Sequence, residues 1–239
     1  MILGEDSEGR QGPACALGLT FVGVFGLRDP LRPKVASCIK YAEDGDVRVR
    51  LVSGDHVETA KAVALKAGIL PLEEAGRVYA VMTAQEFREH VGLSTRQDPV
   101  TGETITEVER EHAFREVAEG LRVLARATAT EKQLLVSGLQ KVLGKKVAAT
   151  GDGINDVHAL RTADVGLAMG SGCSAAKEAA SLVLTDDDFE ASLRAVMWGR
   201  NIYANVSRFL QFQVTANLSV VATVFLGVCI FGDSPLSAV

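Results

Sequence analysis

Seven consecutive residues, Thr150-Gly151-Asp152-Gly153-Ile154-Asn155-Asp156, carry the densest group of chemically active side chains in the sequence. Carboxylate oxygens are the hard ligands that magnesium prefers, and phosphate and water commonly complete its shell. Asp152 is the better ligand candidate, whereas Asp156 could bind the metal or only cap the following helix. Asn155 could hydrogen-bond a phosphoryl group, and the glycines allow the backbone a close approach. The run therefore predicts a magnesium and phosphate site.

Two further segments could contribute to the same site. Ser53-Gly54-Asp55 places a hydroxyl and a glycine amide before an expected helix, where phosphate oxygens can bind, although the same pattern is typical of a plain turn with a helix cap. Lys132 stands at the start of another expected helix and could reach a phosphate as a point charge. Taken alone, Lys132 would be an ordinary surface lysine.

Together these groups indicate phosphoryl transfer, a reaction catalysed mainly by positioning and electrostatics. A carboxylate nucleophile on an earlier strand is missing, because the residues before Leu17 are too few to form another strand and its loop. We therefore expect the 239 residues alone to form no covalent phosphoryl intermediate, which needs that carboxylate.

The elements that must position these loops alternate between strand and helix. Such alternation predicts a parallel sheet with crossover helices, and ligands bind at the carboxyl ends of its strands. The polar region 85–119 is expected to hold a surface loop between short helices. The expected strands are Leu17–Leu27, Val47–Val52, Arg122–Ala125, Lys146–Ala149, Asp164–Met169 and Ser181–Leu184, and the expected helices are Pro33–Ala42, Val57–Ala67, Glu131–Leu143 and Ile154–Ala163.

The C-terminal part differs in character. Val214–Phe231 contains 18 residues without a charge, and Phe209–Val214 can extend this stretch, so we expect a membrane-spanning helix. Arg194, Arg200 and Arg208 precede it, and basic residues mark the cytosolic flank of such helices. The alternative is a buried core helix. The net charge of −5 gives no support to nucleic-acid binding, and the four scattered cysteines suggest neither a zinc site nor a disulfide framework.

The order of these motifs resembles the P-type ATPases. The run Thr150–Asp156 with its continuation to Leu160 resembles their hinge and magnesium signature, and Ser53-Gly54-Asp55 resembles their second phosphate-binding loop. Leu121–Ala127 with Glu131-Lys132 resembles their lysine motif. The match continues in order through Asp29–Arg32, Ala168–Gly170, Ala176–Ala179, Leu184–Asp187 and Trp198–Tyr203, and Phe209–Gln213 resembles the entry to the fifth transmembrane helix of plasma-membrane-type, calmodulin-regulated calcium pumps.

This resemblance implies a role for each matching residue. Lys132 would neutralise the phosphoryl group, and Asp152 would bind magnesium with Asp156 beside it. Phosphoryl oxygens would be held by Asn155, Ser53 and Gly54, with Asp55 positioning the loop and Arg126 lying near the nucleotide. Asn217 matches an asparagine of the calcium site; an amide in mid-bilayer is costly unless it faces a polar pathway, although a hydrogen bond between helices would also satisfy it.

The resemblance also implies an architecture. We expect an incomplete Rossmann-like sheet of the haloacid dehalogenase type, without its central strand, followed by a long helix. Residues 1–188 would belong to the phosphorylation domain, 189–208 to a cytosolic stalk, 209–232 to the transmembrane helix and 233–239 to a truncated loop. The implied cofactors are magnesium and ATP. The implied partners are calcium as the transported ion, the lipid bilayer, the remaining pump domains, and calmodulin through a segment outside these residues.

Some positions depart from the family pattern. Val220 stands where reticulum-type pumps carry a glutamate of a second calcium site, which favours the plasma-membrane type. Ser53 replaces a threonine but keeps the hydroxyl, Val157-His158 replaces a small residue and proline, and the loop Ser171–Ala175 is one residue short. The alternatives are a soluble phosphatase of the haloacid dehalogenase type and a non-catalytic module that binds magnesium or phosphate.

Overall fold

The computed structural model of the protein describes residues 3–5, 11–13, 30–97 and 104–231. The chain divides into two units, residues 1–30 and 31–239. In the first unit the strands β1 (Leu3–Glu5) and β2 (Gln11–Pro13) pair antiparallel. The expected strand Leu17–Leu27 lies outside the described residues.

Among its described residues, the second unit contains two parallel sheets of three strands, in the orders β3-β7-β4 and β10-β9-β8. The first consists of β3 (Leu51–Val52), β7 (Val123–Ala125) and β4 (Val81–Thr83). The second consists of β8 (Ala148–Gly151), β9 (Val165–Met169) and β10 (Leu182–Leu184). The alternating α/β order with parallel strands confirms the predicted fold class. Among the described residues, the outer strands β3, β4, β8 and β10 each pair with one neighbour.

The strand β7 is buried along its whole length and organises the first sheet. Its alternate side chains enter two different hydrophobic clusters, because neighbouring residues of a strand point to opposite faces. Leu124 packs in a cluster with residues of α3 (Ala84–Val91), α4 (Glu111–Gly120) and α5 (Ala129–Lys141). Val123 and Ala125 pack with residues of α1 (Val35–Asp44) and α2 (Val57–Ala67). Helices therefore cover both faces of this sheet.

Several helix ends follow directly from local sequence. Gly68 ends α2 in the left-handed conformation with φ 81°, where a residue without a Cβ is not strained. Thr83 and Glu86 form a capping box at the start of α3, and Thr128 and Glu131 form another at the start of α5. As a result, α3 begins directly after the carboxyl end of β4, and α5 begins a few residues after the carboxyl end of β7.

Some expected boundaries were wrong. The region 85–119 was expected to contain a loop between short helices, but β5 (Leu93–Gln97) and β6 (Thr104–Val108) form an antiparallel hairpin between α3 and α4. Strand β4 was not anticipated, and β3 spans only two residues of Val47–Val52. The expected helix Ile154–Ala163 is divided into the short 3-10 helix η1 (Ile154–Asp156) and α6 (Val157–Thr162).

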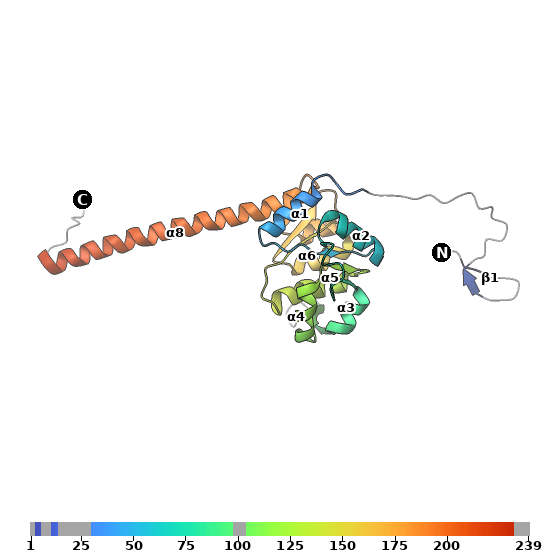
Figure 1. The fold of residues 1–239 in the computed structure, drawn as a ribbon. Helices are drawn as coiled ribbons and strands as arrows, with labels where there is room; N and C mark the ends of the chain where they lie inside the picture. Colours follow the sequence, from blue (N-terminus) through green and yellow to red (C-terminus); the bar gives the residue numbers. More distant parts are fainter. Residues whose placement is uncertain (1–2, 6–10, 14–29, 98–103, 232–239) are drawn as a thin grey trace. The chain divides into compact units, whose positions relative to one another are not determined.

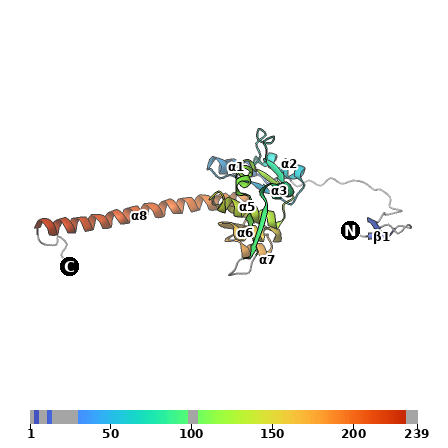
Figure 2. The same cartoon turned by 90° about the horizontal axis from the view of Figure 1, so that it is seen from below.

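The last helix, α8, runs without interruption from Phe189 to Phe231, after the short helix α7 (Ser174–Ala179). Within the described residues it is long and apolar enough to cross a membrane: its most apolar window has a mean hydropathy of 1.8, and only 6% of that window is buried. Beyond its first turns α8 extends away from the sheets of the second unit in both views (Figures 1 and 2). The alternative of a buried core helix is therefore wrong.

Candidate phosphoryl and magnesium site

Lys132 and Asp156 meet although 24 residues separate them. The Lys132 Nζ donates to Asp156 Oδ1 at 2.6 Å, and both side chains are mostly buried, with exposed fractions of 11% and 16%. Asp156 Oδ2 also accepts from the Gly153 amide at 3.4 Å, a bond that caps the 3-10 helix η1, whereas its side chain makes no capping bond to α6. The carboxylate therefore joins the glycine turn to the first turn of α5, so the sequence interpretation of Asp156 as only a helix cap is not what the structure contains.

Gly151 makes this contact sterically feasible. A Cβ at position 151 would overlap the Asp156 side chain. Gly151 ends β8, so the carboxylate of Asp156 folds back over the end of the strand that precedes its own loop. A glycine is needed here for close approach rather than for an unusual backbone conformation.

Asp152 lies exposed in the same turn, and its carboxylate makes no hydrogen bond or ion pair within the described part of the chain. Its backbone is held by the loop that precedes α7: the Cys173 amide donates to the Asp152 carbonyl at 2.9 Å. A Cβ on Gly172 would come within 3.1 Å of the Asp152 carbonyl oxygen. The shortened loop that the sequence left uninterpreted therefore supports the backbone of the candidate metal ligand. Asn155 is also exposed.

The Ser53 loop is folded around its own hydroxyl. The Ser53 Oγ donates to Asp55 Oδ2 at 2.8 Å and accepts from the Asp55 amide at 3.1 Å. Gly54, the middle residue of this loop before α2, is exposed. Asp55 thus fixes the hydroxyl of Ser53 in place.

The segment Arg126-Ala127 connects this loop to α5. The amide of Arg126 donates to the Asp55 carbonyl at 3.0 Å, and the amide of Ala127 donates to the Ser53 carbonyl at 2.9 Å. Arg126 has φ 52°, an uncommon conformation for a residue other than glycine, and its side chain is exposed. Because α5 begins only two residues after Ala127, the contacts link the Ser53 loop, the lysine and the Asp156 turn in one continuous series.

Glu131 is a supporting residue to which the sequence analysis assigned no separate role. Its side chain is 1% exposed and accepts from both the amide and the hydroxyl of Thr128, which fixes the first turn of α5 next to Lys132. Arg88 Nε pairs with its other oxygen at 3.4 Å, so the buried charge has a partner. The Thr-x-x-Glu spacing of a capping box was the signal available in the sequence.

The donor set suits a magnesium ion better than a metal held by protein groups alone. No group of three or more His, Cys, Asp or Glu residues is arranged for a metal within the described residues. Two carboxylates lie in one turn, one of them without a protein partner. Magnesium usually keeps several waters and takes one or two carboxylates plus phosphate, so the site fits this ion.

Two other predicted residues lie away from this site. Asn217 is exposed on α8, where the Gln213 Nε2 lies 3.5 Å from its Oδ1. His158, which departs from the family pattern, is exposed on α6.

Comparison with known proteins identifies the class to which this fold and site belong. The family model for haloacid dehalogenase-like hydrolases matches residues 3–164. The chain belongs to this family, which accounts for its parallel sheets and for the loops at their strand ends.

The relatives are more specific. Over 93% of the chain, the sequence is 43% identical to plasma membrane calcium-transporting ATPase 1 of Gallus gallus and of Homo sapiens. It is 42% identical to plasma membrane calcium-transporting ATPase 3 of Homo sapiens over 92% of the chain. The chain spans 17–18% of the length of these relatives. Within its family, the chain is thus similar to one segment of the calcium-transporting P-type ATPases.

A solved structure supports the same fold. A zinc-transporting PIB-type ATPase in the E2.Pi state superposes with a TM-score of 0.57 at 22% identity, covering 84% of this chain and 24% of that one. At this identity the likeness concerns the fold.

Proposed function

We propose that these residues are the phosphate- and magnesium-binding part of the phosphorylation domain of an ATP-driven calcium pump, together with one helix that joins the domain to the membrane. The observation that carries the proposal is the 2.6 Å contact between Lys132 and Asp156, which brings the lysine motif to the magnesium turn. The similarity to calcium-transporting ATPases over 93% of the chain supports the choice of reaction and ion.

Each site residue has a physical role in this proposal. Lys132 offers positive charge to a phosphoryl group, and its pairing with Asp156 stabilises both buried charges while no substrate is bound. Asn155, the Ser53 hydroxyl and the Gly54 amide are the candidate donors to phosphoryl oxygens. Asp55 holds the Ser53 hydroxyl.

Magnesium and ATP are the proposed cofactor and substrate. Asp152, whose carboxylate has no partner in the described chain, is the first magnesium ligand, and Asp156 is the second. The bound ion would neutralise phosphate charge during transfer. Arg126, exposed and held in place through its backbone, is the residue proposed to lie near the nucleotide.

The membrane part of the proposal concerns α8. We propose residues 1–188 as phosphorylation domain, 189–208 as cytosolic stalk, 209–232 as transmembrane helix and 233–239 as the following loop. The exposed apolar surface of α8 supports a bilayer environment, and Asn217 is proposed to contribute to the path of the calcium ion. The other pump domains are its proposed partners.

The proposal is tested with the 239-residue chain in detergent. The phosphorylation motif of P-type ATPases, Asp-Lys-Thr-Gly-Thr, supplies the carboxylate that is phosphorylated and does not occur in these residues, so we expect no acid-stable label from radioactive ATP. We expect magnesium-dependent binding of inorganic phosphate, measured by calorimetry, and its loss in Lys132→Met. Arg115→Gln, on the exposed side of α4, is the matched control and should bind as the original chain does. A phosphate affinity that is the same with and without magnesium, and the same in Lys132→Met, would refute the proposed site.

A further inference from the structure

Met197 on α8 is a methionine that the fold leaves open to solvent. It is 45% exposed, whereas Met82 is 5% exposed in the core and Met169 is partly buried at the end of β9. Oxidation of a methionine converts its thioether into a polar sulfoxide, and exposed side chains are the more susceptible ones. Among the described methionines, Met197 is therefore the first to meet an oxidant in solution.

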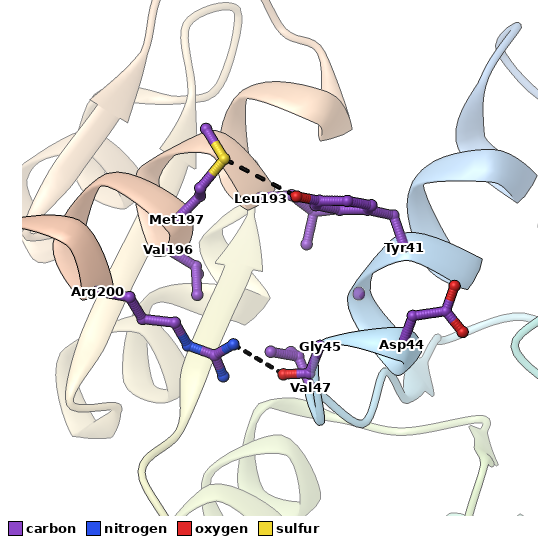
Figure 3. Close-up of a pocket in the computed structure, with 9 residues that line it drawn as sticks. Tyr41, Asp44, Gly45, Val47, Leu193, Val196, Met197 and Arg200 are labelled. Carbon is purple, nitrogen blue, oxygen red and sulfur yellow. Dashed lines mark hydrogen bonds between the residues drawn. The ribbon is translucent and has the colours of Figure 1, made fainter.

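The sulfur of Met197 faces a hydroxyl group on another helix. The Tyr41 Oη of α1 donates to the Met197 Sδ at 3.9 Å, and Figure 3 shows the two side chains pointing toward each other. A thioether sulfur is a weak acceptor, so this contact contributes little in its present form. The donor is nevertheless already directed at the atom that an oxidant changes.

A cavity beside this contact gives the sulfur room for one more atom. Its volume is about 270 Å³, and Tyr41 and Met197 line it together with the apolar side chains of Val47, Leu193 and Val196. A water molecule occupies about 30 Å³ in the liquid, so the cavity is large enough for an added oxygen. The packing of α1 against α8 thus does not exclude the oxidised side chain.

We propose that Met197 is a site of reversible oxidation by a hydroperoxide, and that its sulfoxide holds α8 to α1 more firmly than the thioether does. The sulfur lone pair attacks one oxygen of hydrogen peroxide, so an S–O bond forms and the O–O bond breaks. The proton on the transferred oxygen passes to the departing oxygen, which leaves as water. Sulfur loses two electrons and the peroxide gains them. Methionine sulfoxide reductases reverse the change.

The firmer attachment follows from the acceptor that the reaction creates. An O–H···O hydrogen bond from Tyr41 to the sulfoxide oxygen replaces the long contact with sulfur, and such bonds are normally 2.5–3.0 Å long. The new bond acts between the same helices as the Lys34–Glu190 ion pair. It concerns only the contact of α1 with α8, so the proposal does not depend on phosphoryl transfer or on calcium transport.

The test treats the full chain in detergent with hydrogen peroxide and follows each methionine by peptide mass spectrometry. The sulfoxide of Met197 should form well before those of Met82 and Met169. Amide hydrogen exchange should then slow by about two- to tenfold in the second half of α1 and in the first turns of α8, because a hydrogen bond between the helices is gained. Treatment with methionine sulfoxide reductases A and B should restore the original exchange rates.

Two variants show whether the sulfoxide and the hydroxyl act together. Tyr41→Phe keeps the aromatic ring but lacks the donor, so Met197 should still be oxidised while exchange does not slow. Met197→Leu leaves the free cysteines open to peroxide, and exchange at the two helices should not change. Slowing that persists in either variant, exchange that is unchanged or faster in the oxidised original chain, or earlier oxidation of Met82 or Met169 would overturn the proposal.

Discussion

At the scale of single residues, close approach matters as much as charge. The Lys132 and Asp156 pair exists because the strand end at Gly151 has no side chain where the carboxylate must lie. Glycines are often needed because they can adopt a positive φ, but Gly151 is not in the left-handed region. The motif needs this glycine because a side chain would occupy the space of the Asp156 carboxylate. Charge and space are specified by residues only five apart.

Gly151→Ala tests this requirement. The added methyl group should displace Asp156 from Lys132, so we expect magnesium-dependent phosphate binding to fall by tenfold or more and the free energy of unfolding to drop by about 1 to 3 kcal/mol. Calorimetry and denaturant unfolding measure the two effects. Gly76→Ala is the control, because a Cβ there meets nothing within 4 Å. Equal behaviour of the two variants would show that the space at Gly151 is not needed.

Asp164 gives a prediction of pH dependence. Hydrogen bonds from Lys146, then Gln140 and the Val147 amide, hold the pKa of this carboxyl well below its ordinary value of 3.8. Asp164 lies immediately before β9. Its carboxylate accepts hydrogen bonds from α5 and from the residues that precede β8, and so connects these segments to β9. A lowered pKa in the folded state contributes stability that is present above the unfolded value and lost as the pH falls through the folded value.

The chain should therefore lose stability as the pH falls below about 4. Asp164→Asn should lower the free energy of unfolding by about 1 to 2 kcal/mol at pH 7, since the bonds lose a charged partner and the site is partly exposed. Urea unfolding at several pH values would measure the difference between the two proteins. That difference should shrink steadily in acid; a constant difference would assign the effect of Asp164 to something other than its ionisation.

At the scale of elements, the helices α1 and α8 are joined by several side-chain contacts. Figure 3 shows Arg200 of α8 pointing to the end of α1, where its Nη1 donates to the Gly45 carbonyl at 2.7 Å. Tyr41 Oη lies 3.9 Å from the Met197 Sδ, and Lys34 pairs with Glu190 at 3.2 Å. The Arg200–Gly45 and Tyr41–Met197 contacts border a cavity of about 270 Å³. A cation at a helix C-terminus is favourable because it meets unpaired carbonyls.

Arg200→Gln should loosen this junction without unfolding the sheets. We expect faster amide hydrogen exchange at the end of α1 and in the first turns of α8, and a loss of about 0.5 to 1.5 kcal/mol in local opening free energy. Amide exchange in β7 should not change, because this strand is buried in the middle of the first sheet and does not contact Arg200. Arg208→Gln, on an exposed part of the same helix, is the control. Uniform acceleration across the chain would contradict a local role for Arg200.

At the scale of the whole molecule, the apolar surface of α8 favours a lipid environment for this helix. Its apolar side chains are exposed over the second half of the helix, which water would not stabilise. Val221→Arg places a charge near the middle of this stretch at a cost of about 2.5 to 3.5 kcal/mol for membrane insertion. We expect the variant to shift from the membrane fraction to the soluble or aggregated fraction in expressing cells.

Tyr203→Arg is the matched control for this experiment. Tyr203 is also exposed, but it lies in the segment proposed as a cytosolic stalk, so a charge there should leave membrane association unchanged. Carbonate extraction followed by immunoblotting measures the distribution. If both variants stay fully in the membrane pellet, the span does not lie where the sequence and α8 place it.

Sequence alone determined the parts of this protein that depend on local patterns. Glycine-aspartate turns after apolar strands, the lysine at a helix start and the long uncharged C-terminal stretch all predict their elements from residues near in the chain. Helix α2 was predicted with its observed bounds, because Gly68 ends it through its own backbone freedom. The hairpin β5–β6 was missed, although the alternating β-branched residues in Thr104–Val108 were a signal for a strand.

Only the tertiary structure decided which of these residues meet. Lys132 could have faced solvent and Asp156 could have done no more than cap a helix, since both alternatives satisfy the local chain. Both side chains are mostly buried, and buried charges of opposite sign are stable only when they pair, so Lys132 and Asp156 pair with each other. This pairing joins residues that lie 24 positions apart in the chain. The support of the Asp152 backbone by the loop at Cys173 likewise depends on a contact between distant segments, which no local pattern encodes.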